Sequence, residues 1–172
     1  MQKEKKPGIG RREFLKDTMK TAAGTAVALH VPSIVPASVF GKNAPSNRIN
    51  IAAIGTGRIS RGHDMPGVWK HNYAQIMAVC DVDLKRANEG KQLVNEYYTK
   101  RDNKPYDGVK LYTDFRELLL NKDIDAVLIS TPDHTHAMIG VAAARAGKHM
   151  YMQKPASLTI AEGRIISNVV QK

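Results

Sequence analysis

The sequence predicts an α/β fold built on a doubly wound parallel sheet. Three observations lead to this class. Short apolar runs alternate with longer segments of helical character from about residue 48 onward. The first apolar run leads directly into a glycine-rich turn, and the second leads into an aspartate. Strands that alternate with helices pair in parallel, because each helix returns the chain to the edge from which the strand started.

The expected elements follow one another along the chain. Apolar runs of strand length lie at residues 49–54, 73–79, 110–113, 125–130 and 148–152. Helices are expected at residues 84–100, 115–121, 137–146 and 159–170. Asp114 is placed to cap the second of these helices, and Gly147 is placed to end the third. Parallel sheets bind ligands beyond the carboxyl ends of their strands. The candidate residues that follow a strand are Gly55, Asp81, Thr131 and Lys154.

Length and charge narrow the class of protein. The chain has 172 residues, enough for about one domain, and a formal net charge of +10. Seven basic and three acidic residues fall within the first 20, and the other 19 basic and 13 acidic residues are scattered after residue 40. Nucleic-acid binders cluster their basic residues on one face, so we expect no nucleic-acid partner. Cys80 is the single cysteine and lies in an apolar run, so we expect a buried core residue and no intrachain disulfide.

The N-terminus has the layout of an export signal. A basic head containing the pair Arg11 and Arg12 precedes a stretch from Thr21 to Gly41 without charged residues. The paired arginines resemble a twin-arginine signal, and the stretch is too weakly apolar for a stable membrane span. The alternative is an ordinary amphipathic helix. We expect a periplasmic or otherwise exported protein, with the signal at residues 1–41, a linker at 42–47 and the folded domain at 48–172.

The turn after the first apolar run predicts a phosphate-binding site. Glycine allows positive φ angles and lets a phosphate approach without a Cβ in the way. Amide N–H groups at the start of the next helix then face a pyrophosphate. Ser60 occupies the third glycine position of the dinucleotide fingerprint, and Gly62 is the alternative. The candidate cofactor contacts in this turn are Gly55, Thr56, Gly57, Arg58 and Ile59.

Asp81 indicates which dinucleotide is bound. It lies 24 residues after Gly57, near the expected separation of about 20. Its carboxylate can accept hydrogen bonds from the adenosine ribose and repels a 2′-phosphate, so we expect NAD rather than NADP. Asp83 competes for this role, and Asp81 could instead cap the following helix. Lys85 and Arg86 could hold a phosphate, which leaves NADP open.

Five motifs occur in order along the chain. They are Gly55-Thr56-Gly57, Asp81, Ser130-Thr131-Pro132-Asp133-His134-Thr135-His136, Ala146-Gly147-Lys148-His149 and Gln153-Lys154-Pro155. Together, from about residue 48 to the end, they resemble the Gfo/Idh/MocA oxidoreductases. The resemblance implies a Rossmann domain followed by a C-terminal α/β domain, and oxidation of sugars, inositols and related polyols. Some exported relatives cleave glycosides by transient oxidation with bound NAD. We therefore expect a fragment, truncated before the substrate domain and inactive alone, of a homo-oligomeric enzyme with a carbohydrate substrate.

The resemblance also implies roles for single residues. The loop Ser130-Thr131-Pro132 would contact the nicotinamide side of the cofactor, and His136 matches the family's histidine. Lys154 matches the catalytic lysine of a Glu-Lys-Pro motif, which reaches cofactor and substrate hydroxyl. Gln153 replaces the glutamate and so removes a charge that favours the ammonium form of Lys154. The Lys154–Pro155 bond is expected to be cis.

Simpler interpretations stay open. Lys154 could be a solvated loop lysine, and His134 and His136 could be a surface pair. No metal site is expected, because two histidines on one turn supply too few ligands. A non-catalytic domain that binds only NAD or a partner is the alternative to an enzyme.

Overall fold

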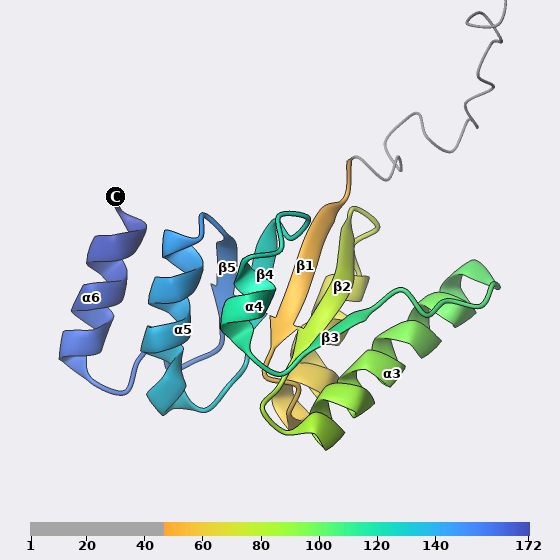
Figure 1. Ribbon diagram of the computed structural model, residues 1–172, viewed down its shortest axis with the longest axis horizontal. Helices are drawn as coiled ribbons and strands as arrows, with labels where there is room; N and C mark the ends of the chain where they lie inside the picture. Colours follow the sequence, from red (N-terminus) through yellow and green to blue (C-terminus); the bar gives the residue numbers. More distant parts are fainter. Residues whose placement is uncertain (1–46) are drawn as a thin grey trace, which may run out of the picture. The chain divides into compact units, whose positions relative to one another are not determined.

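A computed structural model describes residues 47–172 and shows a five-stranded parallel sheet with helices on both faces (Figure 1). The expected export signal, and the linker up to residue 46, lie outside the described residues. All neighbouring strands are parallel, in the order β3-β2-β1-β4-β5. This confirms the predicted doubly wound class. The strands are β1 (Ile49–Ile54), β2 (Ala74–Cys80), β3 (Lys110–Tyr112), β4 (Ala126–Ile129) and β5 (His149–Met152).

The helices depart from the prediction at two places. A π-helical turn and a short helix fill the connection from β1 to β2, for which no range was predicted. The third predicted helix begins at Asp133 rather than at residue 137, because its first turn is polar and carries no apolar periodicity. No helix within residues 47–172 is long and apolar enough to cross a membrane. The helical segments are η3 (Ser60–Asp64), α2 (Met65–Trp69), α3 (Leu84–Asp102), α4 (Phe115–Leu119), α5 (Asp133–Arg145) and α6 (Ile160–Val170).

The core has two layers, one on each face of the sheet. Successive residues of β1 point to opposite faces: Ala52 and Ile54 pack with Ile139 of α5, while Ala53 packs with Met65 of α2. All of these side chains are buried. Because both faces are covered, the central strands read as continuous apolar runs rather than as an alternation of apolar and polar residues.

Tyr98 ties α3 to the sheet where the strand pairing stops. Strand β3 begins opposite Ala78, and the N–H of Ile76, earlier in β2, donates to the Tyr98 hydroxyl at 2.7 Å. The ring is buried, and burial raises the pKa of Tyr98 to about 12. The hydroxyl therefore satisfies a buried backbone donor and fixes α3 to the sheet.

Candidate functional site

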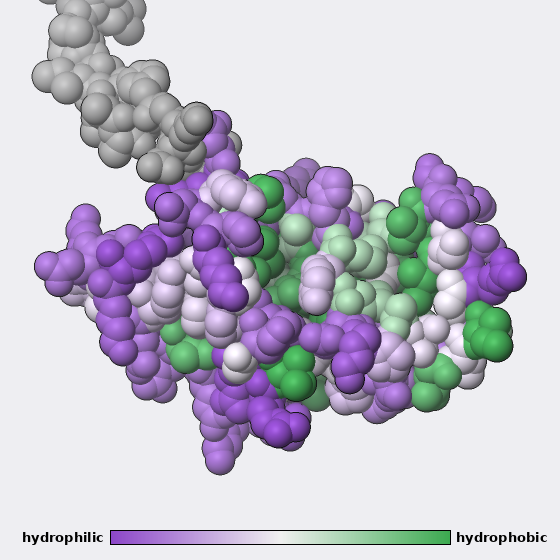
Figure 2. All heavy atoms as spheres, turned by 180° about the vertical axis from the view of Figure 1, so that it is seen from behind, coloured by the Kyte–Doolittle hydropathy of each residue, from purple (hydrophilic) through white to green (hydrophobic). Residues whose placement is uncertain are grey.

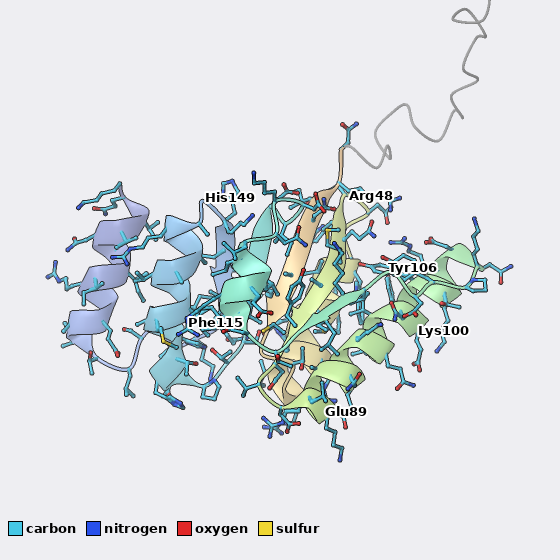
Figure 3. All side chains as sticks on the ribbon, in the orientation of Figure 1. Arg48, Glu89, Lys100, Tyr106, Phe115 and His149 are labelled. Atoms are coloured by element: carbon cyan, nitrogen blue, oxygen red, sulfur yellow. The ribbon has the colours of Figure 1, made fainter. Side chains whose placement is uncertain are left out.

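A cavity of about 270 Å³ opens at the carboxyl ends of β1, β2 and β4. The chain leaves β1 and β4 in opposite directions across the sheet, and such a switch point is where open α/β sheets bind ligands. In Figure 3, Arg48 and His149 mark the edge where strands begin, and Phe115 lies toward the other edge. The predicted residues that line the cavity are Gly55, Gly57, Asp81, Ser130, Thr131 and Pro132. Further lining residues are Val82, Arg86, Thr113, Phe115, His134, Thr135 and Met138.

The two glycines of the turn serve different purposes. Gly55 has a φ of +84°, and a Cβ there would lie 2.8 Å from the carbonyl carbon and oxygen of Ser130. The fold itself therefore requires glycine at this position. A Cβ on Gly57 would meet no protein atom within 4 Å, so the room beside it is available to a ligand. With the helical segment that starts at Ser60, this turn fits a pyrophosphate.

Asp81 has a structural role that the sequence did not predict. Its Oδ2 accepts hydrogen bonds from the Thr56 amide at 2.8 Å and hydroxyl at 3.2 Å, and its Oδ1 accepts from the Asp83 amide at 3.0 Å. An ionised carboxylate has about four acceptor positions. Asp81 therefore holds the glycine turn and still has acceptor capacity at the cavity it lines.

Asp83, the competing carboxylate, is the helix cap. Its side chain accepts hydrogen bonds from the amides of Lys85 and Arg86, at the start of α3. It does not line the cavity, whereas Arg86 does. The structure thus assigns the capping role to Asp83 and places Asp81 in the cavity lining, together with Arg86.

Three predicted contacts of the turn lie outside the cavity lining. Thr56 is fully buried and packs against Gly90 of α3. Arg58 and Ile59 are exposed. Ser60 is fully buried, as expected of a small residue at the third glycine position. The structure therefore brings the glycines to the cavity and directs the intervening threonine into the core.

The turn that carries Lys154 follows β5, at the same edge of the sheet. The Lys154–Pro155 bond is cis, as predicted. His136 is buried, and its Nδ1 and Nε2 lie 2.5 and 2.8 Å from the carbonyl oxygens of Pro155 and Thr131. It therefore links the lysine turn to the loop after β4, and the surface-pair interpretation is wrong for His136. Lys154 itself is exposed and does not line the 270 Å³ cavity.

Asp64 is a site residue that the sequence did not reveal. Its buried carboxylate bonds to Ser130 and Gln153, which lie 66 and 89 residues further along the chain. Such contacts leave no local signal. An acidic residue at the end of a helical turn reads as an ordinary surface position.

Cys80 lines the cavity, but its thiol is not a candidate nucleophile. It is 3% exposed, and burial raises the pKa of its thiol to about 12. A thiol of this kind stays protonated at neutral pH and is a poor nucleophile. The predicted role as a small core residue is confirmed.

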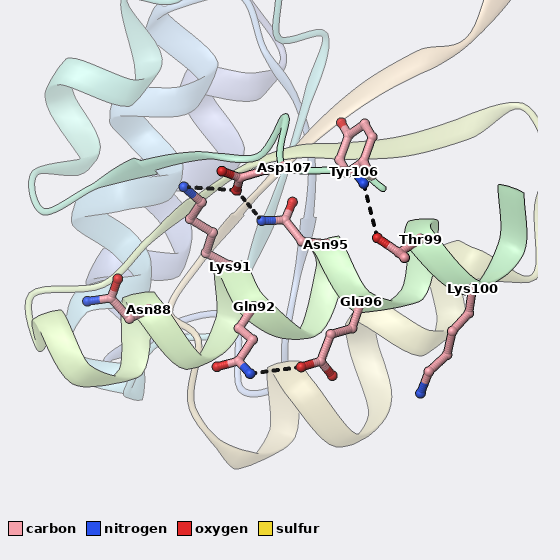
Figure 4. A pocket seen from close by; sticks show the side chains of 9 residues that line it. All are labelled: Asn88, Lys91, Gln92, Asn95, Glu96, Thr99, Lys100, Tyr106 and Asp107. Carbon is pink, nitrogen blue, oxygen red and sulfur yellow. Dashed lines mark hydrogen bonds and ion pairs between the residues drawn. The ribbon is translucent and has the colours of Figure 1, made fainter. Parts of the chain in front are cut away.

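Two other hollows lie away from the carboxyl ends of β1 and β2. The groove on α3 is lined mainly by polar side chains, some of which pair with one another, among them Lys91 and Asn95 with Asp107 (Figure 4). The second hollow lies on the face of the sheet that carries α2, which is the face shown in Figure 2. Its lining combines apolar residues such as Leu128 with His63, Asp64 and His71. Within residues 47–172, no group of three or more metal-binding side chains is present.

The folded part of the chain matches a known family. Residues 49–172 match the model of the Gfo/Idh/MocA family, described as an oxidoreductase family with an NAD-binding Rossmann fold. The match covers 124 of the 172 residues. The chain belongs to the Gfo/Idh/MocA oxidoreductase family. Its parallel sheet, with the strand order β3-β2-β1-β4-β5, agrees with the Rossmann fold of this family.

Relatives of this family differ in their names. A Shewanella sp. (strain ANA-3) protein named glycosyl hydrolase family 109 protein 2 is 32% identical over 170 residues, which cover 90% of this chain and 35% of that protein. Inositol 2-dehydrogenase from Azotobacter vinelandii is 31% identical over 111 residues, 64% of this chain and 30% of the enzyme. The Lactobacillus casei scyllo-inositol dehydrogenase, solved with NAD(H) and scyllo-inositol, has a TM-score of 0.60 and 25% identity over 72% of this chain and 33% of its own. The chain spans about a third of the length of these relatives.

Proposed function

We propose that the whole protein is an NAD-dependent oxidoreductase that acts on a secondary alcohol of a sugar, polyol or glycoside. The observation that carries the proposal is the switch-point cavity, where the glycine turn, Asp81 and the Thr131 loop meet. The inositol dehydrogenases among the relatives support a polyol or sugar as the substrate class. To test the proposal, the whole protein is mixed with NAD and a panel of inositols and sugars, and NADH formation is followed by absorbance.

In this function, the residues at the carboxyl edge of the sheet would have separate roles. Bound NAD would supply the acceptor for the hydride. The Gly55–Gly57 turn would lie against its pyrophosphate, and Asp81 would hold the ribose hydroxyls. Lys154 would bind the substrate hydroxyl and take up or pass on its proton. His136 would keep the lysine turn fixed to the loop after β4 through its two carbonyl contacts.

A redox-assisted glycosidase is the second candidate. It is supported by the Shewanella relatives, which are named as glycosyl hydrolases of family 109. Their match covers 90% of the chain and so extends into the segment before residue 49. The two candidates differ in their products. A dehydrogenase accumulates NADH and a ketone, whereas the glycosidase releases a free sugar with no net NADH. A non-catalytic domain would bind NAD and do neither.

Replacement of Asp81 tests cofactor choice. We expect Asp81→Ala to weaken NAD binding by about 1–3 kcal/mol, roughly 5–150-fold, the usual cost of losing a hydrogen bond to a charged group. NADP should lose less, because the repulsion of its 2′-phosphate disappears as well. Asp83→Ala is the matched control, since it removes a neighbouring carboxylate that caps α3 and should leave the NAD:NADP ratio unchanged. Equal losses for both cofactors, measured by calorimetry, would argue against the assignment.

We also propose that the protein is exported by the twin-arginine route. The support is the pair Arg11 and Arg12 ahead of the uncharged stretch. Replacing both arginines by lysine keeps the charge and should abolish periplasmic accumulation of the whole protein in fractionated cells. Replacing Lys5 and Lys6 by arginine is the control and should have no effect. An unchanged periplasmic yield in the double-lysine variant would contradict the route.

A further inference from the structure

Asp64 is a buried carboxylate that the proposed mechanism does not use. It is the last residue of η3, and its side chain is 1% exposed. The Ser130 hydroxyl donates to Oδ2 at 2.7 Å, and the Gln153 amide donates to Oδ1 at 2.9 Å. His63, which is largely exposed, contacts the same Oδ1 through Nδ1 at 2.9 Å. Asp64 thus connects the loops that follow β1, β4 and β5.

These contacts explain how a charge is tolerated at this position. Burial of an ionised carboxylate is unfavourable unless hydrogen-bond donors replace the lost water. Bonds in which the acceptor is ionised are shorter and stronger than neutral ones, and the Ser130 bond is among the shorter ones here. Asp64 therefore holds its donors more firmly than a neutral side chain would.

Gln153 passes this constraint on to Lys154. Its Nε2 donates to Asp64, and its Oε1 accepts a hydrogen bond from the Lys154 backbone N–H at 2.8 Å. An ionised carboxylate can only accept hydrogen bonds, so it determines which end of the amide faces it. The carbonyl end is then turned to the backbone of Lys154. Asp64 therefore fixes the orientation of the Gln153 amide, and Gln153 in turn holds the backbone of Lys154.

We propose that Asp64 is the positioning residue for Lys154 and acts through the Gln153 amide. We further propose that the fold tolerates a carboxylate at position 64 or at position 153, but not at both. The inference rests on the proposed function for the importance of Lys154. The coupling of Asp64 to the Lys154 backbone follows from the contacts alone. A glutamate at 153 would place a second carboxylate oxygen where Nε2 now lies, 2.9 Å from Oδ1 of Asp64. Two like charges at this distance cannot both stay ionised without moving apart.

Three variants of the chain test the pair. Asp64→Ala removes the acceptor that orients Gln153, and Gln153→Glu adds a second carboxylate. In the double variant Asp64→Asn/Gln153→Glu the two groups are exchanged, so the asparagine amide can donate to the new carboxylate. That carboxylate can still accept from the Lys154 N–H. The first measurement is amide hydrogen exchange at Lys154 by NMR, with the Ile76 amide, bonded to Tyr98, as the internal reference.

We expect Asp64→Ala to speed exchange at Lys154 by about tenfold while Ile76 keeps its rate, since one local hydrogen bond is lost. Gln153→Glu should lower the thermal midpoint by about 5 °C or more. The exchanged double variant should return both values to near those of the native chain. Exchange at Lys154 within twofold of the native rate in Asp64→Ala, or no recovery in the double variant, would overturn the proposal.

A second measurement separates this proposal from the proposed function. In the whole enzyme, Asp64→Ala should lower kcat by about tenfold with KM within about twofold, and the exchanged variant should restore kcat. If the exchange results hold while Lys154→Met retains normal turnover, the proposed function fails and the pairing stands. If Lys154→Met is inactive while neither exchange nor kcat responds to Asp64→Ala, the function stands and the positioning role is refuted.

Discussion

Replacing Lys154 by methionine in the whole enzyme should slow hydride transfer by about 10²–10⁴, the usual contribution of a positioned acid–base group. Methionine keeps much of the length of the lysine side chain but can neither hold a proton nor donate a hydrogen bond. The turn that carries Lys154 is fixed independently of its ammonium group. His136 contacts the Pro155 carbonyl, and Gln153 accepts from the Lys154 N–H. NAD affinity should therefore stay within a few-fold of the native value.

Lys122→Met is the matched control. Lys122 is also exposed and also lies in a loop next to a strand, but it precedes β4 and so lies at the edge where strands begin. Its replacement should leave turnover and NAD affinity unchanged. Stopped-flow measurement of NADH formation compares the two variants. Near-native turnover in Lys154→Met would contradict the catalytic role and favour the alternative, a solvated loop lysine.

Alanine at Gly55 should destabilise the fold, whereas alanine at Gly57 should affect only the ligand. At Gly55 the backbone has positive φ, and the new Cβ would lie 2.8 Å from the backbone of Ser130. Strained backbone costs roughly 1–3 kcal/mol and overpacking a similar amount, so we expect a loss of about 2–5 kcal/mol in the free energy of unfolding. Gly57→Ala meets no protein atom within 4 Å and should leave this free energy within about 1 kcal/mol.

Gly57→Ala, the variant with the smaller effect on stability, should have a direct effect on NAD binding. A methyl group on Gly57 would occupy the room that a pyrophosphate needs, so NAD affinity should fall by about tenfold or more in a chain of normal stability. Urea denaturation and calorimetry on both variants give the comparison. A stable Gly57→Ala chain with native NAD affinity would show that the phosphate lies elsewhere.

Much of the cofactor half of the site could be predicted from local sequence. β1 leads into Gly55 and β2 into Asp81, and the carboxyl ends of neighbouring parallel strands must meet at one edge of the sheet. The structural role of Asp81 was not predictable, because its bonds to Thr56 depend on the conformation of the turn. The choice between Asp81 and Asp83 likewise needed the start of α3, which Asp83 caps.

The residues that the sequence missed are held by distant contacts or by polar helix turns. Asp64 has no local pattern, because its partners Ser130 and Gln153 lie in the loops that follow two other strands. His134 and Thr135 line the cavity because α5 begins at Asp133, and apolar periodicity does not mark a polar first turn. In each case tertiary packing, rather than local propensity, decides the position.

A crystal structure of the protein grown with NAD tests the central claim most directly. The adenosine ribose hydroxyls should lie within hydrogen-bonding distance of Asp81, and the pyrophosphate should lie against the Gly55–Gly57 turn in the switch-point cavity. The nicotinamide should then extend toward the Thr131 loop and the turn that carries Lys154. NAD bound in the groove on α3, or bound with its ribose away from Asp81, would contradict the assignment of this edge as the cofactor site.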